Sequence, residues 1–333
     1  MPEVLFLLVV IAIILALVFD FGNGLNDAAN AIATVVATRA LPLWAAVLLA
    51  AVGNFAGVFI FGVAVATTIA KGLVDPDIVD VYMVLGGLVG SIFWVYFASY
   101  KGIPVSASHA LIGGFVGAAL TKAGIASLNL VGIAKVLVFI VVAPILGMIG
   151  GFLFFTIIIR IFRKADPKKL NRWFRRLQLI SASSYAVTHG ANDAQKTMGI
   201  IAILLFSAGF LGEEFFVPWW VIITSYTVIA LGTLAGGWRV IKTMGIKLTK
   251  LRPVHGFCAE SSGSLVLGFT SIAGIPVSTT HVISGSIIGV GATRRFSAVR
   301  WRLARGILWA WIITIPAAAL VSAASYLTIS LFI

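Results

Sequence analysis

Four acidic side chains lie in apolar segments, where a charge is costly. They are Asp20, Asp27, Asp193 and Glu260, and the other seven of the eleven acids (11 − 4 = 7) lie at the N-terminus or in expected loops. Inserting an Asp at the centre of a membrane helix costs about 2.5–3.5 kcal/mol, so such acids are functional candidates by default. Lys196, three residues after Asp193, is the obvious structural partner for it. We nevertheless expect that neither central acid has a sufficient structural partner.

The two central acids belong to two copies of one motif, GLNDA (24–28) and GANDA (190–194). Because Gly and Asn weaken helices, we expect a broken helix at each motif, with freed backbone groups lining a ligand site. Carboxylate and amide oxygens suit a hard cation such as Na⁺, and amide N–H₂ groups can donate to an anion. The candidate ligands are therefore Asp27 and Asp193 for Na⁺ or a substrate proton, and Asn26 and Asn192 for the substrate.

A second duplicated motif, GIPVSASH (102–109) and GIPVSTTH (274–281), is rich in hydroxyl groups. Its proline fits the first turn of a helix, whose free N–H groups and dipole bind oxyanions. The candidate substrate ligands here are Ser106, Ser108, Ser278, Thr279 and Thr280. We expect each segment to pair with the preceding helix as a hairpin that either spans or re-enters the membrane. His109 and His281 fit packing as well as proton transfer, and we assign them no role.

The elements that position these motifs must lie in a membrane. The chain has 333 residues, of which 60% are hydrophobic and 11% charged, against about 25% charged in soluble domains. Apolar stretches of about 20 residues, enough to cross a hydrocarbon core of ~30 Å, recur along the chain. The net charge of +13 comes from clusters between these stretches, which argues for topology signals and against nucleic-acid binding. We predict an all-α polytopic membrane protein with lipid as its surroundings.

No enzymatic chemistry stands out. A single cysteine excludes an internal disulfide, and no nucleotide-binding glycine motif supports an ATP- or NAD-dependent activity. Neither a nucleophile–base pair nor a metal triad favours an intramembrane enzyme, and a channel would not need a closed, two-sided site. We therefore expect a non-enzymatic transporter of a small oxyanion without a cofactor.

The duplicated motifs divide the chain into two repeats, because their offsets are similar, 166 (192 − 26) and 172 (281 − 109). We expect a first transmembrane repeat at 1–162, a basic cytoplasmic linker at 163–178 and a second transmembrane repeat at 179–333. The elements expected in the first repeat lie near 3–38, 41–70, 81–101, 102–121 and 130–162. Those expected in the second lie near 179–210, 216–241, 255–273, 274–292 and 303–331.

Clusters of Lys and Arg predict the orientation, because short basic loops stay in the cytoplasm. Such clusters lie at 160–176, 239–252 and 294–305, whereas 71–80 is acidic. Counting the crossings between them puts both termini outside and gives each repeat an odd number of crossings. The repeats then have inverted topology, as in secondary transporters whose substrate binds near the midplane. We expect a multi-pass protein of the inner (cytoplasmic) membrane, and the sequence leaves a homodimer open.

These doubled motifs resemble the inorganic phosphate transporter (PiT) family of secondary symporters. The likeness covers essentially the whole chain and includes HGFCAESSGSLVLG (255–268). The short central linker resembles the prokaryotic members. The resemblance implies symport of inorganic phosphate with Na⁺ or H⁺, with sulfate as the alternative substrate. It also implies that two Asn-Asp helices and two hairpins surround the site.

The resemblance adds two residues to the candidate ligands of a coupling ion or a phosphate proton. Glu260 resembles the membrane glutamate of the family's second half, and Asn30 is the counterpart of Lys196 across the repeat. The chain departs from the animal members at Asn54, where those proteins have a glutamate. A changed carboxylate count can change the cation sites, so the choice between Na⁺ and H⁺ stays open.

Overall fold

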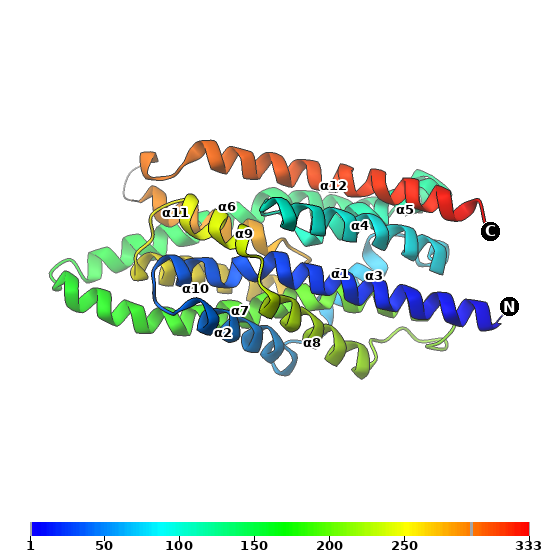
Figure 1. Ribbon diagram of the computed structural model, residues 1–333, viewed down its shortest axis with the longest axis horizontal. Coiled ribbons are helices and arrows are strands. Elements are labelled where there is room, and N and C mark those ends of the chain that lie inside the picture. The colour runs from blue at the N-terminus through cyan, green and yellow to red at the C-terminus, as the bar shows by residue number, and fades with distance from the viewer. Residues whose placement is uncertain (1, 294–295, 333) are drawn as a thin grey trace.

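The chain folds into helices that run along one long axis (Figure 1). The computed structural model describes residues 2–293 and 296–332, so Arg294 and Arg295 of the predicted basic cluster lie outside the described residues. The first half contains α1 (Pro2–Ala37), α2 (Leu43–Ala56), α3 (Ala64–Gly72), α4 (Val81–Lys101), α5 (Ala107–Ala123) and α6 (Leu130–Ile161). The second contains α7 (Pro167–Ser207), α8 (Trp219–Ala235), α9 (Trp238–Ile241), α10 (Pro253–Ile272), α11 (Thr279–Ala292) and α12 (Trp301–Ser330). The predicted all-α class is confirmed over these ranges.

Several helices are long and apolar enough to cross a membrane. In the described ranges these are α1, α4, α6 and α12, and two bent helix pairs raise the number from four to six if each pair counts as one span. The most apolar windows of α6 and α12 are only 22% and 28% buried inside the protein. Apolar helices with such exposed surfaces have lipid as their natural surroundings. The protein is therefore a multi-pass membrane protein, as predicted.

The helices that carry the Asn-Asp motifs are unbroken, so the break predicted at these motifs is wrong. α1 is one continuous helix of 36 residues that includes the first motif, and α7 is one continuous helix of 41 residues that includes the second. The motif glycines serve as contact points between helices. A Cβ atom on Gly24 would lie 2.3 Å from the carbonyl oxygen of Ile229, and one on Gly190 would lie 2.3 Å from that of Asn54. This close packing outweighs the helix-propensity cost of Gly, about 1 kcal/mol per residue.

The breaks lie instead where single long helices were expected, at 41–70 and 216–241. α2 and α3 meet at 82°, and α8 and α9 at 68°. Two backbone N–H groups at the start of α3 donate to Gln195 Oε1 at 2.9 and 3.4 Å, so a side chain of α7 holds this second helix start. Gly236 ends α8 with a φ of 63°, a conformation that favours glycine.

α4 with α5, and α10 with α11, form the two expected hairpins, and their tips meet in the middle of the molecule (Figure 1). Ser108 Oγ donates to the Val277 carbonyl at 3.3 Å, and Thr280 Oγ1 donates to the Val105 carbonyl at 3.0 Å. By helix rise, the 21 residues of α4 extend about 32 Å, against about 54 Å for the 36 residues of α1. Each hairpin therefore reaches only part of the way along the molecule.

α1 and α7, the helices that carry the two Asn-Asp motifs, run in opposite directions. α1 leads away from the end where both chain termini lie, and α7 leads back from the opposite end, where α6 turns into α7 (Figure 1). α7 begins at Pro167, because Asp166 caps it by accepting from the Lys168 N–H at 2.8 Å. The helix expected from residue 179 therefore starts earlier, and most of the basic segment 163–178 is helical.

Candidate functional site

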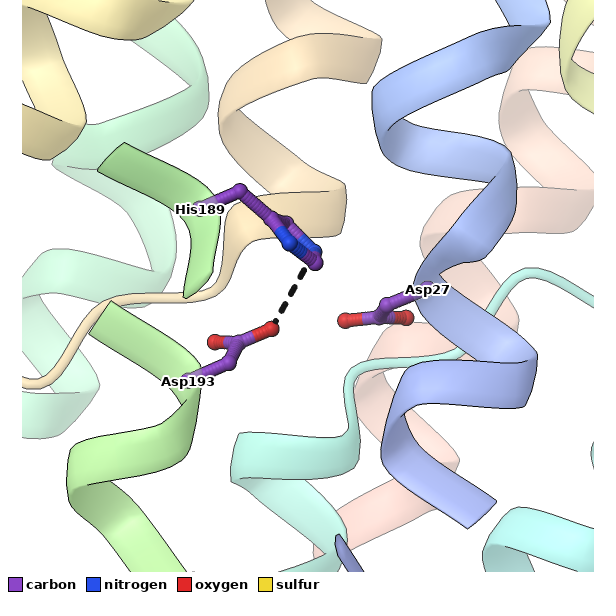
Figure 2. A group of neighbouring side chains, drawn as sticks. All are labelled: Asp27, His189 and Asp193. Carbon is purple, nitrogen blue, oxygen red and sulfur yellow. Dashed lines mark ion pairs between the residues drawn. The ribbon is translucent and has the colours of Figure 1, made fainter. Parts of the chain in front are cut away.

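Asp27 of α1 and Asp193 of α7, the two central acids, point toward one another, with His189 beside them (Figure 2). One ligand atom from each of these side chains lies within 4.8 Å of the other two. His189 Nε2 is 3.3 Å from Asp193 Oδ2. All three residues are buried, with at most 2% exposure. The two predicted acids therefore share one buried site built from both halves.

The tip of the second hairpin lies against both acids. Thr279 Oγ1 is 3.1 Å from Asp27 Oδ2 and 3.1 Å from Asp193 Oδ2. A hydroxyl has one proton to donate, so Thr279 bonds one carboxylate at a time. Thr280 Oγ1 lies 3.3 Å from Asp27 Oδ1 and accepts from Asn30 Nδ2 at 3.0 Å. Two of the predicted hydroxyl ligands and Asn30 are thus brought to the acids.

Lys196 is the partner of Asp193. Its Nζ atom lies 2.5 Å from Asp193 Oδ1, 2.5 Å from Ser108 Oγ and 2.9 Å from the Val277 carbonyl oxygen. The expectation that Asp193 lacks a sufficient partner is therefore wrong. Asp27 differs, because no Lys, Arg or His in the described part of the chain forms an ion pair with it. The two copies of the motif thus carry acids in different electrostatic settings.

Asn26 and Asn192 each bond to the hairpin of their own half. Asn26 Nδ2 donates to Ser99 Oγ at 2.8 Å, and Asn192 Nδ2 donates to Ser271 Oγ at 3.3 Å. The two serines are related by the hairpin offset of 172 (271 − 99), a signal by which the sequence could have identified them. Both asparagine Oδ1 atoms are buried without a hydrogen-bond partner among the described residues. They are acceptors that a bound ligand can use.

Ser106 and Ser278 cap the second helix of each hairpin. Ser106 Oγ accepts from the His109 N–H at 3.1 Å, and Ser278 Oγ accepts from the His281 N–H at 3.3 Å. Such caps satisfy otherwise free N–H groups at a helix start. Within residues 2–293 and 296–332, no hydrogen bond joins either serine to the central acids. These two predicted ligands therefore shape the hairpin tips.

Glu260 lies away from the central acids. Its carboxylate accepts from Gln178 Nε2 at 2.9 Å and from Ser181 Oγ at 2.5 Å, both on α7. Ser181 precedes Asp193 by twelve residues (193 − 181), about 18 Å along the helix. The structure therefore places this predicted coupling-ion ligand in a second buried polar cluster nearer the α6–α7 turn.

The sequence did not predict a chain of hydrogen-bonded side chains next to Asp193. His189 Nδ1 is 3.0 Å from Asn54 Oδ1, and Asn54 Nδ2 donates to Thr233 Oγ1 at 2.8 Å. His189 precedes Asp193 by one helical turn, a spacing that places both side chains on one face. That spacing was visible in the sequence. The hydrogen bonds of Asn54 connect the site to α2 and α8, the helices after which the two breaks occur.

A buried pair of acids between two helices and two hairpin tips, inside an apolar shell, is the arrangement of a helical membrane transporter. Residues 23–322 match the phosphate transporter family, and the chain belongs to that family. It is therefore a transporter of the phosphate class, and not an enzyme.

Named relatives support this assignment. The probable low-affinity inorganic phosphate transporter of Rhizobium meliloti (strain 1021) is 53% identical over 96% of this chain and 96% of its own length. The protein of the same description from Bacillus subtilis (strain 168) is 42% identical over 99% of each chain. A solved structure, "The sodium-dependent phosphate transporter", matches with a TM-score of 0.90 at 27% identity, covering 98% of this chain and 100% of that one. The resemblance inferred from the doubled motifs is confirmed.

Proposed function

We propose that this chain is a symporter that carries inorganic phosphate together with Na⁺ across the cytoplasmic membrane. The observation that carries the proposal is Asp27, a carboxylate with 2% exposure and no ion pair in the described ranges. Isolated buried charges are strongly disfavoured. Binding a cation from solution would neutralise Asp27, and its neighbours Thr280 and Asn30 offer further oxygen ligands. The similarity to a protein described as sodium-dependent supports Na⁺ as that cation.

Electrostatics couples the two substrates. A phosphate anion near two carboxylates is repelled unless positive charge accompanies it. Lys196 supplies one charge beside Asp193, and Na⁺ at Asp27 would supply the other. The positive ends of α5 and α11 lie at the hairpin tips, where free N–H groups favour an oxyanion. Phosphate binding therefore becomes favourable once Na⁺ is bound.

Opening of the site must alternate between two sides. The central acids are buried, so either substrate can enter only after neighbouring elements separate. The tip-to-tip bonds of Ser108 with Val277 and of Thr280 with Val105 are the contacts that must loosen. We infer that the two halves are inverted repeats, that the hairpins re-enter from opposite faces, and that rocking of one half against the other exposes the site.

Uptake by purified protein in liposomes tests the proposal. With a Na⁺ gradient and equal pH on both sides, labelled phosphate should accumulate above its outside concentration. A pH gradient in Na⁺-free choline buffer should not drive accumulation. Accumulation driven by the pH gradient alone would assign the coupling to H⁺ and overturn the Na⁺ proposal. Empty liposomes with the same gradients provide the background.

A further inference from the structure

The Lys196 ammonium is bound as a small cation would be. Its neighbours are a carboxylate oxygen of Asp193, the hydroxyl of Ser108 and the backbone carbonyl of Val277, at 2.5, 2.5 and 2.9 Å. An ammonium has three N–H donors and no acceptor, so all its donors have partners. Carboxylate, hydroxyl and unwound backbone carbonyl oxygens are also the ligands that transporters offer to Na⁺.

The first half contains the counterpart of this ligand set. The helix offset of 166 relates Asp193 to Asp27 (193 − 166) and Lys196 to Asn30 (196 − 166). The hairpin offset of 172 relates the other two ligands, Ser108 to Thr280 (108 + 172) and Val277 to Val105 (277 − 172). The duplicated sequence therefore specifies the same three oxygen types twice, with an amide in place of the ammonium.

The structure brings these counterparts together. Thr280 Oγ1 lies 3.3 Å from Asp27 Oδ1 and 3.0 Å from the Val105 carbonyl oxygen. Asn30 Nδ2 donates to the same hydroxyl at 3.0 Å. Asn30 Oδ1 is buried and has no hydrogen-bond partner in the described part of the chain. The first-half set thus has one carboxylate, one free amide oxygen and no cationic side chain.

We propose that Lys196 is a tethered cation that fills one of two equivalent cation sites, so that only the first-half set takes up a transported cation. The filled site consists of Asp193, Ser108 and the Val277 carbonyl. The open site consists of Asp27, Thr280, the Val105 carbonyl and Asn30. The identity of the transported cation rests on the proposed function, whereas the filling of one site by Lys196 does not. The protein then carries one cation fewer per phosphate than a chain with asparagine at both positions.

Lys196→Asn tests the proposal, because it copies the first-half residue into the second half. Purified variant and wild type are compared by thermal unfolding in detergent, in NaCl and in choline chloride. A cation that binds the folded state raises Tm with its concentration. The variant should therefore show a larger Na⁺-dependent rise in Tm than the wild type. In liposomes, its ratio of transported ²²Na⁺ to ³²P-phosphate should be higher by one ion.

Lys122→Asn is the matched control. Lys122 also pairs with an aspartate, Asp80, at 2.6 Å, but the side chains of this pair are 23% and 41% exposed. Its removal should leave the Na⁺-dependent rise in Tm unchanged. An equal Na⁺ response in wild type and Lys196→Asn, with an unchanged ion ratio, would overturn the proposal and make Lys196 a purely structural partner of Asp193.

Asn30→Lys keeps the proposal testable if Lys196→Asn does not fold. A lysine at position 30 should fill the remaining site, so the Na⁺-dependent rise in Tm should disappear. A full Na⁺ response in Asn30→Lys would contradict the proposal. These measurements also distinguish the two proposals. If Na⁺ does not raise the Tm of the wild type, the Na⁺ coupling of the proposed function is refuted. If Na⁺ raises the Tm of Lys196→Asn alone, the proposal that Lys196 fills a cation site is still supported.

Discussion

At the residue scale, one motif used twice gives two acids with different surroundings. Asp193 is paired with Lys196 and lies beside His189. Asp27 lies within hydrogen-bond distance of the Thr279 and Thr280 hydroxyl groups and forms no ion pair with a described residue. The sequence offers Lys196 as a partner for Asp193 and none for Asp27, but whether that partner suffices depends on the hairpin atoms that also bind its ammonium.

This difference predicts opposite effects on stability. Asp193→Asn should lower the free energy of unfolding by about 3–5 kcal/mol, because it leaves the Lys196 ammonium buried without its counter-charge. Asp27→Asn removes a buried charge that forms no ion pair with any described residue and should leave Tm in Na⁺-free buffer at or above the wild-type value. Thermal unfolding of both amide variants checks this. A larger loss of stability in Asp27→Asn would refute the assigned charge states.

Substrate choice also depends on single atoms. Phosphate carries at least one P–OH near neutral pH, whereas sulfate carries none. The unpartnered Oδ1 atoms of Asn26 and Asn192 can accept from that hydroxyl. Leaving a buried acceptor unpaired costs about 1–3 kcal/mol, so sulfate should inhibit phosphate uptake about tenfold more weakly than unlabelled phosphate. Arsenate, which keeps a hydroxyl, should compete like phosphate. Equal inhibition constants for sulfate and phosphate would refute the hypothesis that the asparagine oxygens recognise the phosphate hydroxyl.

At the element scale, helix type and most boundaries could be predicted from the sequence. The expected helix at 81–101 matches α4 residue for residue, because Asp80 caps its start and Gly102 ends it. The helix breaks after α2 and after α8 could not be predicted from the local sequence. They depend on contacts between distant segments, such as the bonds from the start of α3 to Gln195, which no local pattern contains.

The site shows the same division. The motifs predicted that Asp27, Asp193 and the threonines of the second hairpin lie close together, because paired motifs in a duplicated chain converge, and the structure brings them together. Glu260 was grouped with them by family resemblance, whereas its partners are Gln178 and Ser181. Residues that support the site from neighbouring helices, such as Thr233, require the fold to be recognised.

Close packing at the motif glycines predicts a further effect on stability. Gly24→Ala would place a Cβ atom 2.3 Å from the Ile229 carbonyl oxygen, so α1 and α8 must separate and Tm should fall. Gly306→Ala is the matched control, because no atom of the described residues lies within 4 Å of its added Cβ. The control should be neutral or stabilising, since Ala favours a helix over Gly. Equal Tm values for the two variants would show that α1 does not rely on this contact.

At the scale of the whole molecule, both chain termini lie at one end and the α6–α7 turn lies at the other (Figure 1). The basic residues near that turn predict that it faces the cytoplasm. In a Cys258→Ser background, a cysteine at position 168 should resist membrane-impermeant thiol reagents added outside intact cells. A cysteine at position 332 should react. Labelling of position 168 from outside would reverse the proposed orientation.

In the buried centre between the two halves, Asp193 is paired with Lys196, whereas Asp27 forms no ion pair with the described residues, and this difference is the basis of the proposed coupling. Concentrative phosphate uptake into liposomes under a Na⁺ gradient tests that claim most directly, with wild type and Asp27→Asn measured side by side. Wild type should accumulate phosphate above the outside concentration, and Asp27→Asn should at most equilibrate it. Accumulation by Asp27→Asn to the wild-type level would contradict the account.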